Sequence, residues 1–295
     1  MSIRVIVLGD LMVDVVVRPL HETAATSDTA STVRLSRGGA AANVAVTLAA
    51  AGCEVHFAGF VGSDAFADFV LEDLRRANVT TRIRHADAAT GVVVAMIAPD
   101  GQRAMFTDRG ANARLDPSSA VELTRGDFDH LHLSGYTILG EETYDCARAV
   151  IHSAIQRGST VSVDVCSLGP LVKLGADKFL AAAKGATTLL ANEEEALALS
   201  GTSDVNSAVS TLSQYFSEVM ITCGPRGAVA LYNSQQVVAP ALDSTVIDTT
   251  GAGDAASGSY LAARLAGETL ESSLARAMVA ASQVLGTLGS RAQSR

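Results

Sequence analysis

The sequence predicts an α/β fold built on a parallel β-sheet. Short apolar, β-branched runs alternate with alanine-rich segments of helical spacing along most of the chain. Strands that are apolar throughout are buried on both faces, so the sheet needs helices on both sides. With 295 residues, 48% of them hydrophobic, the chain can build a large core. We therefore expect one domain spanning residues 1–295.

The alternating part of the chain predicts six strands and six helices. The strands are expected at Val5–Leu8, Val55–Phe60, Leu131–Leu133, Val161–Val165, Thr188–Ala191 and Val219–Thr222. The helices are expected at Ala41–Ala51, Asp64–Ala77, Glu142–Arg157, Asn192–Ser200, Val205–Phe216 and Ala255–Ala266. Ligands of open α/β sheets bind at the carboxyl ends of the strands, so we look for functional residues there.

Two segments depart from this alternation. Residues 13–36 read as a strand, a polar stretch and another strand, with no helix between them. Residues 91–108 read as strands Val92–Ala98 and Ala104–Thr107, joined by a hairpin turn at Pro99-Asp100-Gly101. Four such strands would form a small sheet outside the main one. We expect it to act as a lid over a ligand crevice, the alternative being a surface extension without function.

Composition excludes several classes of partner. Lys and Arg total 22 against 31 Asp and Glu, a net charge of −9, which disfavours nucleic acids and anionic membrane surfaces. Charged residues interrupt the apolar N-terminal stretch, so no window is long enough to span a membrane. The four cysteines are scattered and resemble buried apolar residues in a reducing compartment. We expect a cytoplasmic protein that acts on small molecules.

The strongest chemical signal is the run from Asp248 to Asp254. Gly251, Ala252 and Gly253 leave backbone N–H groups uncovered where a helix begins, and such a position favours anions. Asp254, expected at the first helical position, could merely cap that helix. The two glycines and the second acid favour the approach of a bulky anion instead. A base beside an anion hole is what transfer of a phosphoryl group to a hydroxyl requires.

A glycine pair precedes the first expected helix. Gly38 and Gly39 permit close contact with a ligand or with another part of the backbone, or allow the helix to pack tightly on the sheet. Asn43 offers the donor and the acceptor that sugar hydroxyls require. Asp14, near the end of the first strand, needs a polar ligand or an arginine neighbour.

Other polar residues follow later strands. The acids of segment 192–195 could serve only the helix dipole, or could hold Mg²⁺ through water. Segment 222–227 carries two glycines in a turn, by itself a weak signal. His130 and His132 share one face of a strand, a pattern that favours a structural role over metal binding.

Taken in order along nearly the whole chain, these motifs resemble the PfkB, or ribokinase-like, family of carbohydrate kinases. The matching positions are Gly9 and Asp14, Gly38-Gly39 with Asn43, Asn192 with Glu195, Thr222 with Gly224 and Gly227, and the run 248–254. The resemblance implies a three-layer sandwich with a central, mostly parallel sheet and a small β-sheet lid. It also implies ATP-dependent phosphorylation of a primary hydroxyl of a small sugar.

The resemblance assigns a role to each motif. Asp254 would be the general base, and the amides of Gly251, Ala252 and Gly253 the anion hole. The sugar would be held by Asp14, Gly38, Gly39 and Asn43, and ATP by Asn192, Thr222, Gly224 and Gly227. Glu195 would hold Mg²⁺ through water. A monovalent cation, K⁺, would lie near Asp248 and Thr250, with Gly289 and Ser290 as weaker candidates. The lid would also form a homodimer surface.

Three points leave the substrate open. Met12 stands where ribose-specific members often have Asn. Arg109 could meet a carboxylate or phosphate of the substrate, or form a salt bridge at the edge of the lid. A nucleoside kinase is an alternative, although only 4% of residues are aromatic and none is Trp. A non-catalytic sugar or nucleotide sensor is the other alternative, which the intact acid and loop glycines disfavour.

Overall fold

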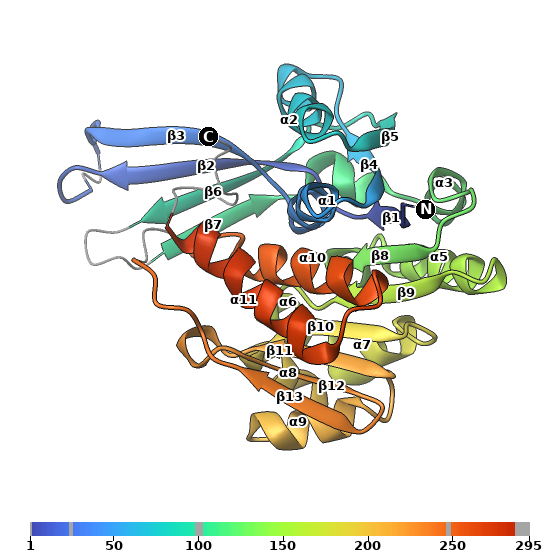
Figure 1. The fold of residues 1–295 in the computed structure, drawn as a ribbon. Coiled ribbons are helices and arrows are strands. Elements are labelled where there is room, and N and C mark those ends of the chain that lie inside the picture. The colour runs from blue at the N-terminus through green and yellow to red at the C-terminus, as the bar shows by residue number, and fades with distance from the viewer. Residues whose placement is uncertain (1, 24–25, 98–102, 246–248, 287–295) are drawn as a thin grey trace.

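The computed structural model describes residues 2–23, 26–97, 103–245 and 249–286 (Figure 1). Its larger sheet contains β1 (Arg4–Leu8), β4 (Glu54–Val61), β5 (Thr80–His85), β8 (His130–Ser134), β9 (Thr160–Asp164), β10 (Thr188–Asn192), β11 (Glu218–Thr222), β12 (Ala228–Tyr232) and β13 (Gln235–Ala239). The strand order is β13-β12-β11-β10-β9-β8-β1-β4-β5. All neighbours pair in parallel except at the β11-β12-β13 end, which is antiparallel.

The six predicted strands occupy consecutive positions in the parallel part of this sheet. Three further strands, β5, β12 and β13, were not predicted. β5 and β13 are the two edge strands, and their sequences mix polar and apolar residues, whereas the apolar β12 lies between β13 and β11. The α/β prediction is confirmed.

Helices cover both faces of the sheet (Figure 1). One layer contains α1 (Ala40–Ala50), α2 (Ala65–Arg76), α10 (Ala252–Leu265) and α11 (Leu270–Leu285). The other contains α3 (Pro117–Leu123), α5 (Tyr144–Gln156), α6 (Leu168–Leu174), α7 (Ala176–Ala182), α8 (Glu193–Ser200) and α9 (Val205–Leu212). The short α4 (Tyr136–Leu139) follows β8. All six predicted helices are present, whereas α3, α4, α6, α7 and α11 were not predicted.

Two separate cores hold the layers together. Val5 and Val7 of β1 pack in the core beneath α1 and α10, whereas Ile6 and Leu8 pack in the core beneath α5. This alternation is what a strand buried on both faces requires. The three-layer sandwich expected from the sequence is confirmed.

A second, four-stranded sheet projects beyond the first (Figure 1). We call it the lid; its strands are β2 (Met12–Pro19), β3 (Ser31–Gly38), β6 (Gly91–Ile97) and β7 (Arg103–Asp108), in the order β3-β2-β6-β7. Each predicted strand pair is an antiparallel pair, and the two pairs join through parallel β2 and β6. The small sheet is confirmed, while the turn predicted at 99–101 lies outside the described residues.

Two expectations drawn from composition can be compared with the fold. Within the described residues, no helix combines the length and the apolar character needed to cross a lipid bilayer. All four cysteines are free thiols, as their scattered spacing predicted.

His130 and His132 are buried and share the hydroxyl of Ser162, at 2.7 Å and 2.9 Å. Burial lowers the pKa of each to about 3, so both are neutral structural side chains.

Candidate active site

A cleft of about 720 Å³ lies between the inner face of the lid and the carboxyl edge of the larger sheet. The lid contributes Met12, Asp14, Val16, Ser36, Val93, Ala95, Met105 and Thr107. The rest of the molecule contributes, among others, Asp10, Gly39, Asn43, Arg109, Tyr136, Gly140, Cys166, Thr250, Gly251 and Asp254. We call this the substrate cleft. Its lid side is largely apolar, and its opposite side carries most of its carboxylates.

Asp254 enters the cleft from the first turn of α10. The helix begins at Ala252, after Gly251 in the left-handed region at φ 78°, so Asp254 is its third residue. The prediction that Asp254 occupies the first helical position was wrong. The N-cap residue is Gly251, which has no side chain to cap the helix, and the Asp254 carboxylate accepts a hydrogen bond from Asn43 Nδ2 at 2.7 Å. The capping interpretation of Asp254 therefore does not hold.

The N-terminus of α10 lies open beside this carboxylate. Its first intrahelical bond runs from the Ala255 N–H to the Gly251 carbonyl at 2.9 Å. The N–H groups of the preceding turn have no acceptor within the helix. The Ala252 N–H lies 3.4 Å from the Thr249 carbonyl, a long contact. Gly253 is exposed, and a Cβ placed there would meet nothing within 4 Å. Among the described residues, no side chain lies against Gly253.

Burial raises the pKa of Asp254 to about 7. The Asn43 hydrogen bond opposes this rise, while the charges of Asp164 and Asp14 add to it. Burial likewise raises the pKa of Asp164 to about 6 and, helped by Asp164, that of Glu195 to about 7. Three carboxyl groups from β9, α8 and α10 thus influence one another at the carboxyl edge of the sheet.

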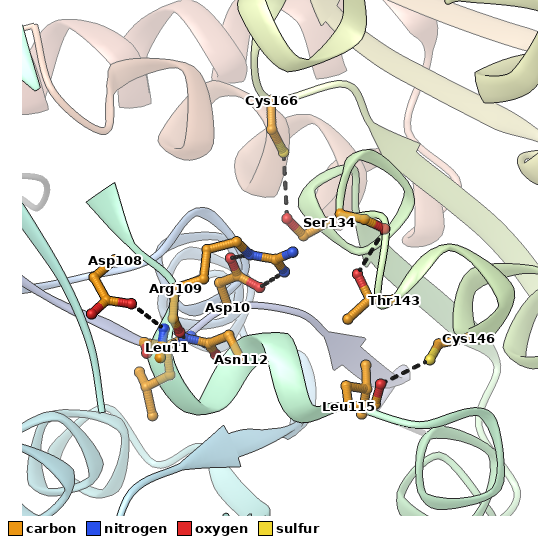
Figure 2. Close-up of polar contacts among 12 residues, drawn as sticks. Asp10, Leu11, Asp108, Arg109, Asn112, Leu115, Ser134, Thr143, Cys146 and Cys166 are labelled. Atoms are coloured by element: carbon orange, nitrogen blue, oxygen red, sulfur yellow. Dashed lines mark hydrogen bonds and ion pairs between the residues drawn. The ribbon is translucent and has the colours of Figure 1, made fainter. Parts of the chain in front are cut away.

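Asp164, a residue that the sequence did not assign to the site, connects the end of β9 to α10. Its carboxylate accepts hydrogen bonds from the Ser257 hydroxyl at 2.7 Å and from the Cys166 N–H at 3.2 Å. Cys166 adopts a positive φ of 72°, which is uncommon outside glycine, and its thiol lies 3.4 Å from the Ser134 hydroxyl (Figure 2). Ser134 and Cys166 each directly follow a predicted strand, and that position was the sequence signal that could have assigned them to the site.

The two glycines before α1 are required by close contacts within the protein. A Cβ at Gly38 would overlap the carboxylate of Asp14, and one at Gly39, where φ is 98°, would overlap the backbone carbonyl of Asp10. Asp14 belongs to β2 of the lid, within the segment 13–36 that the sequence predicted to begin with a strand. Gly39, Asn43 and Asp14 line the substrate cleft, whereas Gly38 is not among its described lining residues.

Arg109 pairs with Asp10 in the wall of the cleft (Figure 2). Its Nη2 lies 2.9 Å from Asp10 Oδ1 and its Nε lies 3.2 Å from Oδ2. Arg109 thus contacts Asp10, which the sequence did not assign to the site. The predicted salt bridge of Arg109 exists, and the same side chain also faces the cleft.

The residues predicted to hold ATP lie at the ends of β10 and β11. Asn192 and Thr222 are direct neighbours across these parallel strands. Asn192 Oδ1 accepts from the Glu195 N–H at 2.9 Å, and Glu195 Oε2 accepts from the Asn192 N–H at 3.0 Å, so the two form a capping box. These residues belong to the same edge as the substrate cleft but are absent from its described lining.

The two turn glycines after β11 differ in their surroundings. A Cβ at Gly227, with φ 93°, would overlap the carbonyl of Ala239 in β13, so this glycine serves the sheet edge. Gly224 has φ 55°, and a Cβ there would meet nothing within 4 Å. Gly224 therefore leaves an open surface beside Thr222, whereas Gly227 has a structural reason of its own.

The predicted cation residues are only partly described. Thr250 lines the cleft next to Gly251. Asp248, Gly289 and Ser290 lie outside the described residues. Within the described ranges, no group of three or more His, Cys, Asp or Glu side chains is arranged to hold a metal ion.

A family model for pfkB family carbohydrate kinases matches residues 2–295. The chain belongs to the PfkB family of carbohydrate kinases. Two relatives show the range within this family. The chain is 29% identical to the ATP-dependent ribose-1-phosphate kinase of Halopiger xanaduensis. The alignment covers 88% of this chain and 83% of that relative. The chain is also 29% identical over 90% of its length to 85% of the fructokinase of Klebsiella pneumoniae.

The fold of this PfkB kinase also matches a solved structure closely. A probable sugar kinase from Rhizobium etli superposes with a TM-score of 0.90, covering all of this chain and 96% of the other, at 23% identity. At that identity the likeness concerns the fold, which agrees with the family assignment.

Proposed function

We propose that this kinase transfers the γ-phosphoryl group of ATP to a primary hydroxyl of a small sugar, with Asp254 as the general base. One observation carries the proposal. Asp254 lies in the substrate cleft directly beside the open N-terminus of α10, and its pKa is raised to about 7. A base that titrates near neutral pH suits proton abstraction from a hydroxyl under physiological conditions.

The proton of the attacking hydroxyl would pass to a carboxylate oxygen of Asp254 as the oxygen attacks the phosphorus. Asn43 Nδ2, 2.7 Å from Oδ2 of that carboxylate, holds it in place. The amides of Gly251, Ala252 and Gly253 would stabilise the negative charge on the transferred group, because they point from a helix N-terminus. Asp14, Gly38, Gly39 and Arg109 would hold the sugar above this base.

The ends of β10 and β11 supply the surface for ATP. Asn192, Thr222, Gly224 and Gly227 would line the nucleotide site, Gly227 by shaping the backbone. Glu195 is buried at 3% exposure and faces the carboxyl edge beside Asp164 and Asp254, which fits a role in holding Mg²⁺ through water. Mg²⁺ would neutralise phosphate charge there. Thr250 and Asp248 would take part in a K⁺ site.

The lid offers a surface for a homodimer. Asp14 and Ser36 face the cleft, so by strand alternation Val33 and Leu35 of β3 face outward, and they are 58% and 54% exposed. Phe106 of β7 lies on the same outer face and is 58% exposed. Exposed apolar residues in one sheet face suit a second copy of the chain. Free thiols in every cysteine agree with a cytoplasmic location.

Replacing the base tests this function directly. Asp254→Asn keeps the size of the side chain but cannot accept the proton, so kcat should fall by about 10²–10⁴-fold. The KM for ATP should change little. Steady-state assays on a panel of sugars, with adenosine included, would measure this. The matched control is Asp177→Asn, an exposed carboxylate of α7, which should retain wild-type kcat. Full turnover by Asp254→Asn would refute the assigned role.

A further inference from the structure

The ion pair in the cleft wall leaves one nitrogen of Arg109 available. Nε and Nη2 are occupied by the two oxygens of Asp10, which is itself only 3% exposed. Nη1 is buried and makes no hydrogen bond with any residue in the described part of the chain. A buried donor without a partner is costly, which makes it notable in a ligand cleft.

The packing around Nη1 keeps this donor at the cleft. Gly140, at the end of α4, also lines the cleft, and a Cβ there would overlap Nη1. The absence of a side chain at Gly140 therefore makes room for the guanidinium. Since the other two nitrogens hold Asp10, the guanidinium is fixed in orientation before any substrate arrives. Such a donor is preorganised to meet an acceptor atom of the substrate.

The charges around the donor are mostly negative. Among the described residues that line the cleft, Arg109 is the only basic side chain, whereas Asp10, Asp14 and Asp254 are carboxylates. Burial acts to lower the pKa of Arg109, but the charge and hydrogen bond of Asp10, helped by the charge of Glu142, outweigh it and raise that pKa. Asp10 thus balances the guanidinium, and an incoming anion would meet the two further carboxylates of the cleft, Asp14 and Asp254. Like charges placed together in a binding site suppress the wrong ligand.

We propose that the Asp10–Arg109 pair selects an uncharged sugar. Arg109 Nη1 donates a hydrogen bond to a neutral oxygen of the substrate, a hydroxyl or a carbonyl, and Asp10 excludes a phosphate or carboxylate at that position. This inference rests on the proposed kinase function and names its substrate class. It separates this chain from kinases whose acceptor already carries a phosphate.

The test compares dissociation constants within pairs of sugars that differ in charge. Ribose with ribose 1-phosphate, and fructose with fructose 1-phosphate, are titrated calorimetrically with Mg²⁺ and a non-hydrolysable ATP analogue. The wild-type protein should bind the neutral member of at least one pair about tenfold or more tightly than its phosphate. Tighter binding of the phosphates would overturn the inference, and this comparison needs no variant.

Variants then identify the source of the discrimination. Asp10→Asn keeps hydrogen bonding to Arg109 but leaves its charge unbalanced, so the neutral-to-phosphate affinity ratio should fall by about tenfold or more. Asp14→Asn removes one charge from the same cleft but leaves the ion pair, so its ratio should change less. Arg109→Gln should weaken binding of the neutral sugar without improving that of the phosphate. An unchanged ratio in Asp10→Asn would overturn the inference.

The two proposals fail in different ways. A protein that binds a neutral sugar selectively but never forms a phosphorylated product would refute the proposed function and support the selection by Asp10. A protein that phosphorylates a sugar phosphate faster than the free sugar would refute the selection and support the kinase function. Binding of no sugar in the panel would overturn both.

Discussion

At the scale of single residues, the carboxyl group of Asp254 is the feature that most determines reactivity. Burial raises its pKa to about 7, and the neighbouring charge of Asp164 contributes to that rise. The carboxyl must be ionised to accept a proton. Activity should therefore be lost as the pH falls through the pKa of the folded protein, and not as it rises.

The pH dependence of kcat/KM tests this reading. Below pH 7 the rate should drop by about tenfold for each unit, because the protonated acid is inactive. Asp164→Asn removes a negative charge near Asp254 while keeping a partner for Ser257, so the profile should move to lower pH. Glu194→Gln, an exposed acid of α8, should leave the profile in place. A profile with no break between pH 5 and 8 would contradict the raised pKa.

At the scale of elements, the start of α8 combines structural and functional interpretations. Asn192 caps this helix through its side-chain oxygen, and Glu195 completes the capping box. A cap alone explains both residues without any ligand. The position of Asn192 beside Thr222, at the carboxyl edge of the sheet, is the reason for assigning it to ATP as well.

Substituting the cap separates the two roles. Asn192→Ser retains a good N-cap, so the melting temperature should stay near the wild-type value while the KM for MgATP rises. Asn192→Ala should lose both, with a cost of about 1 kcal/mol in the free energy of unfolding. Thermal unfolding and steady-state kinetics measure the two effects. If Asn192→Ser keeps the wild-type KM, Asn192 serves only as a cap.

At the scale of the whole molecule, the lid presents apolar side chains on both of its faces. Met12, Val16 and Val93 face the cleft, while the exposed residues Leu35 and Phe106 face away from it. The inner face can contact a substrate. The outer face has no such role within one chain, which is why we assign it to a second copy.

Charges placed on the outer face should separate the proposed dimer. Leu35→Glu and Phe106→Glu should each shift the sedimentation mass from dimer to monomer, because burying a charge in an apolar interface is costly. Val172→Glu provides the control, since Val172 is 67% exposed and belongs to α6, not to the lid. It should remain dimeric. A wild-type protein that sediments as a monomer at micromolar concentration would contradict the assignment.

The sequence predicted the parallel centre of the sheet and the lid because their strands are continuous apolar runs or clear strand pairs. It did not predict β5, where Thr80–His85 mixes polar and apolar residues at an edge. In the site, Asp254 and Asn43 were each identified from a local motif. Their contact, and the pairing of Asp10 with Arg109, could not be, because neither neighbouring sequence indicates a partner so distant along the chain.

The hydrogen bond between Asn43 and Asp254 spans 211 positions in the sequence. During synthesis, the lid and the first half of the larger sheet leave the ribosome long before Asp254 of α10 does. Contacts over such separations also close slowly, since a long loop must be ordered first. A nascent or truncated chain that stops before α10 therefore contains the lid and Asn43 but lacks Asp254, the partner that Asn43 contacts in the folded protein.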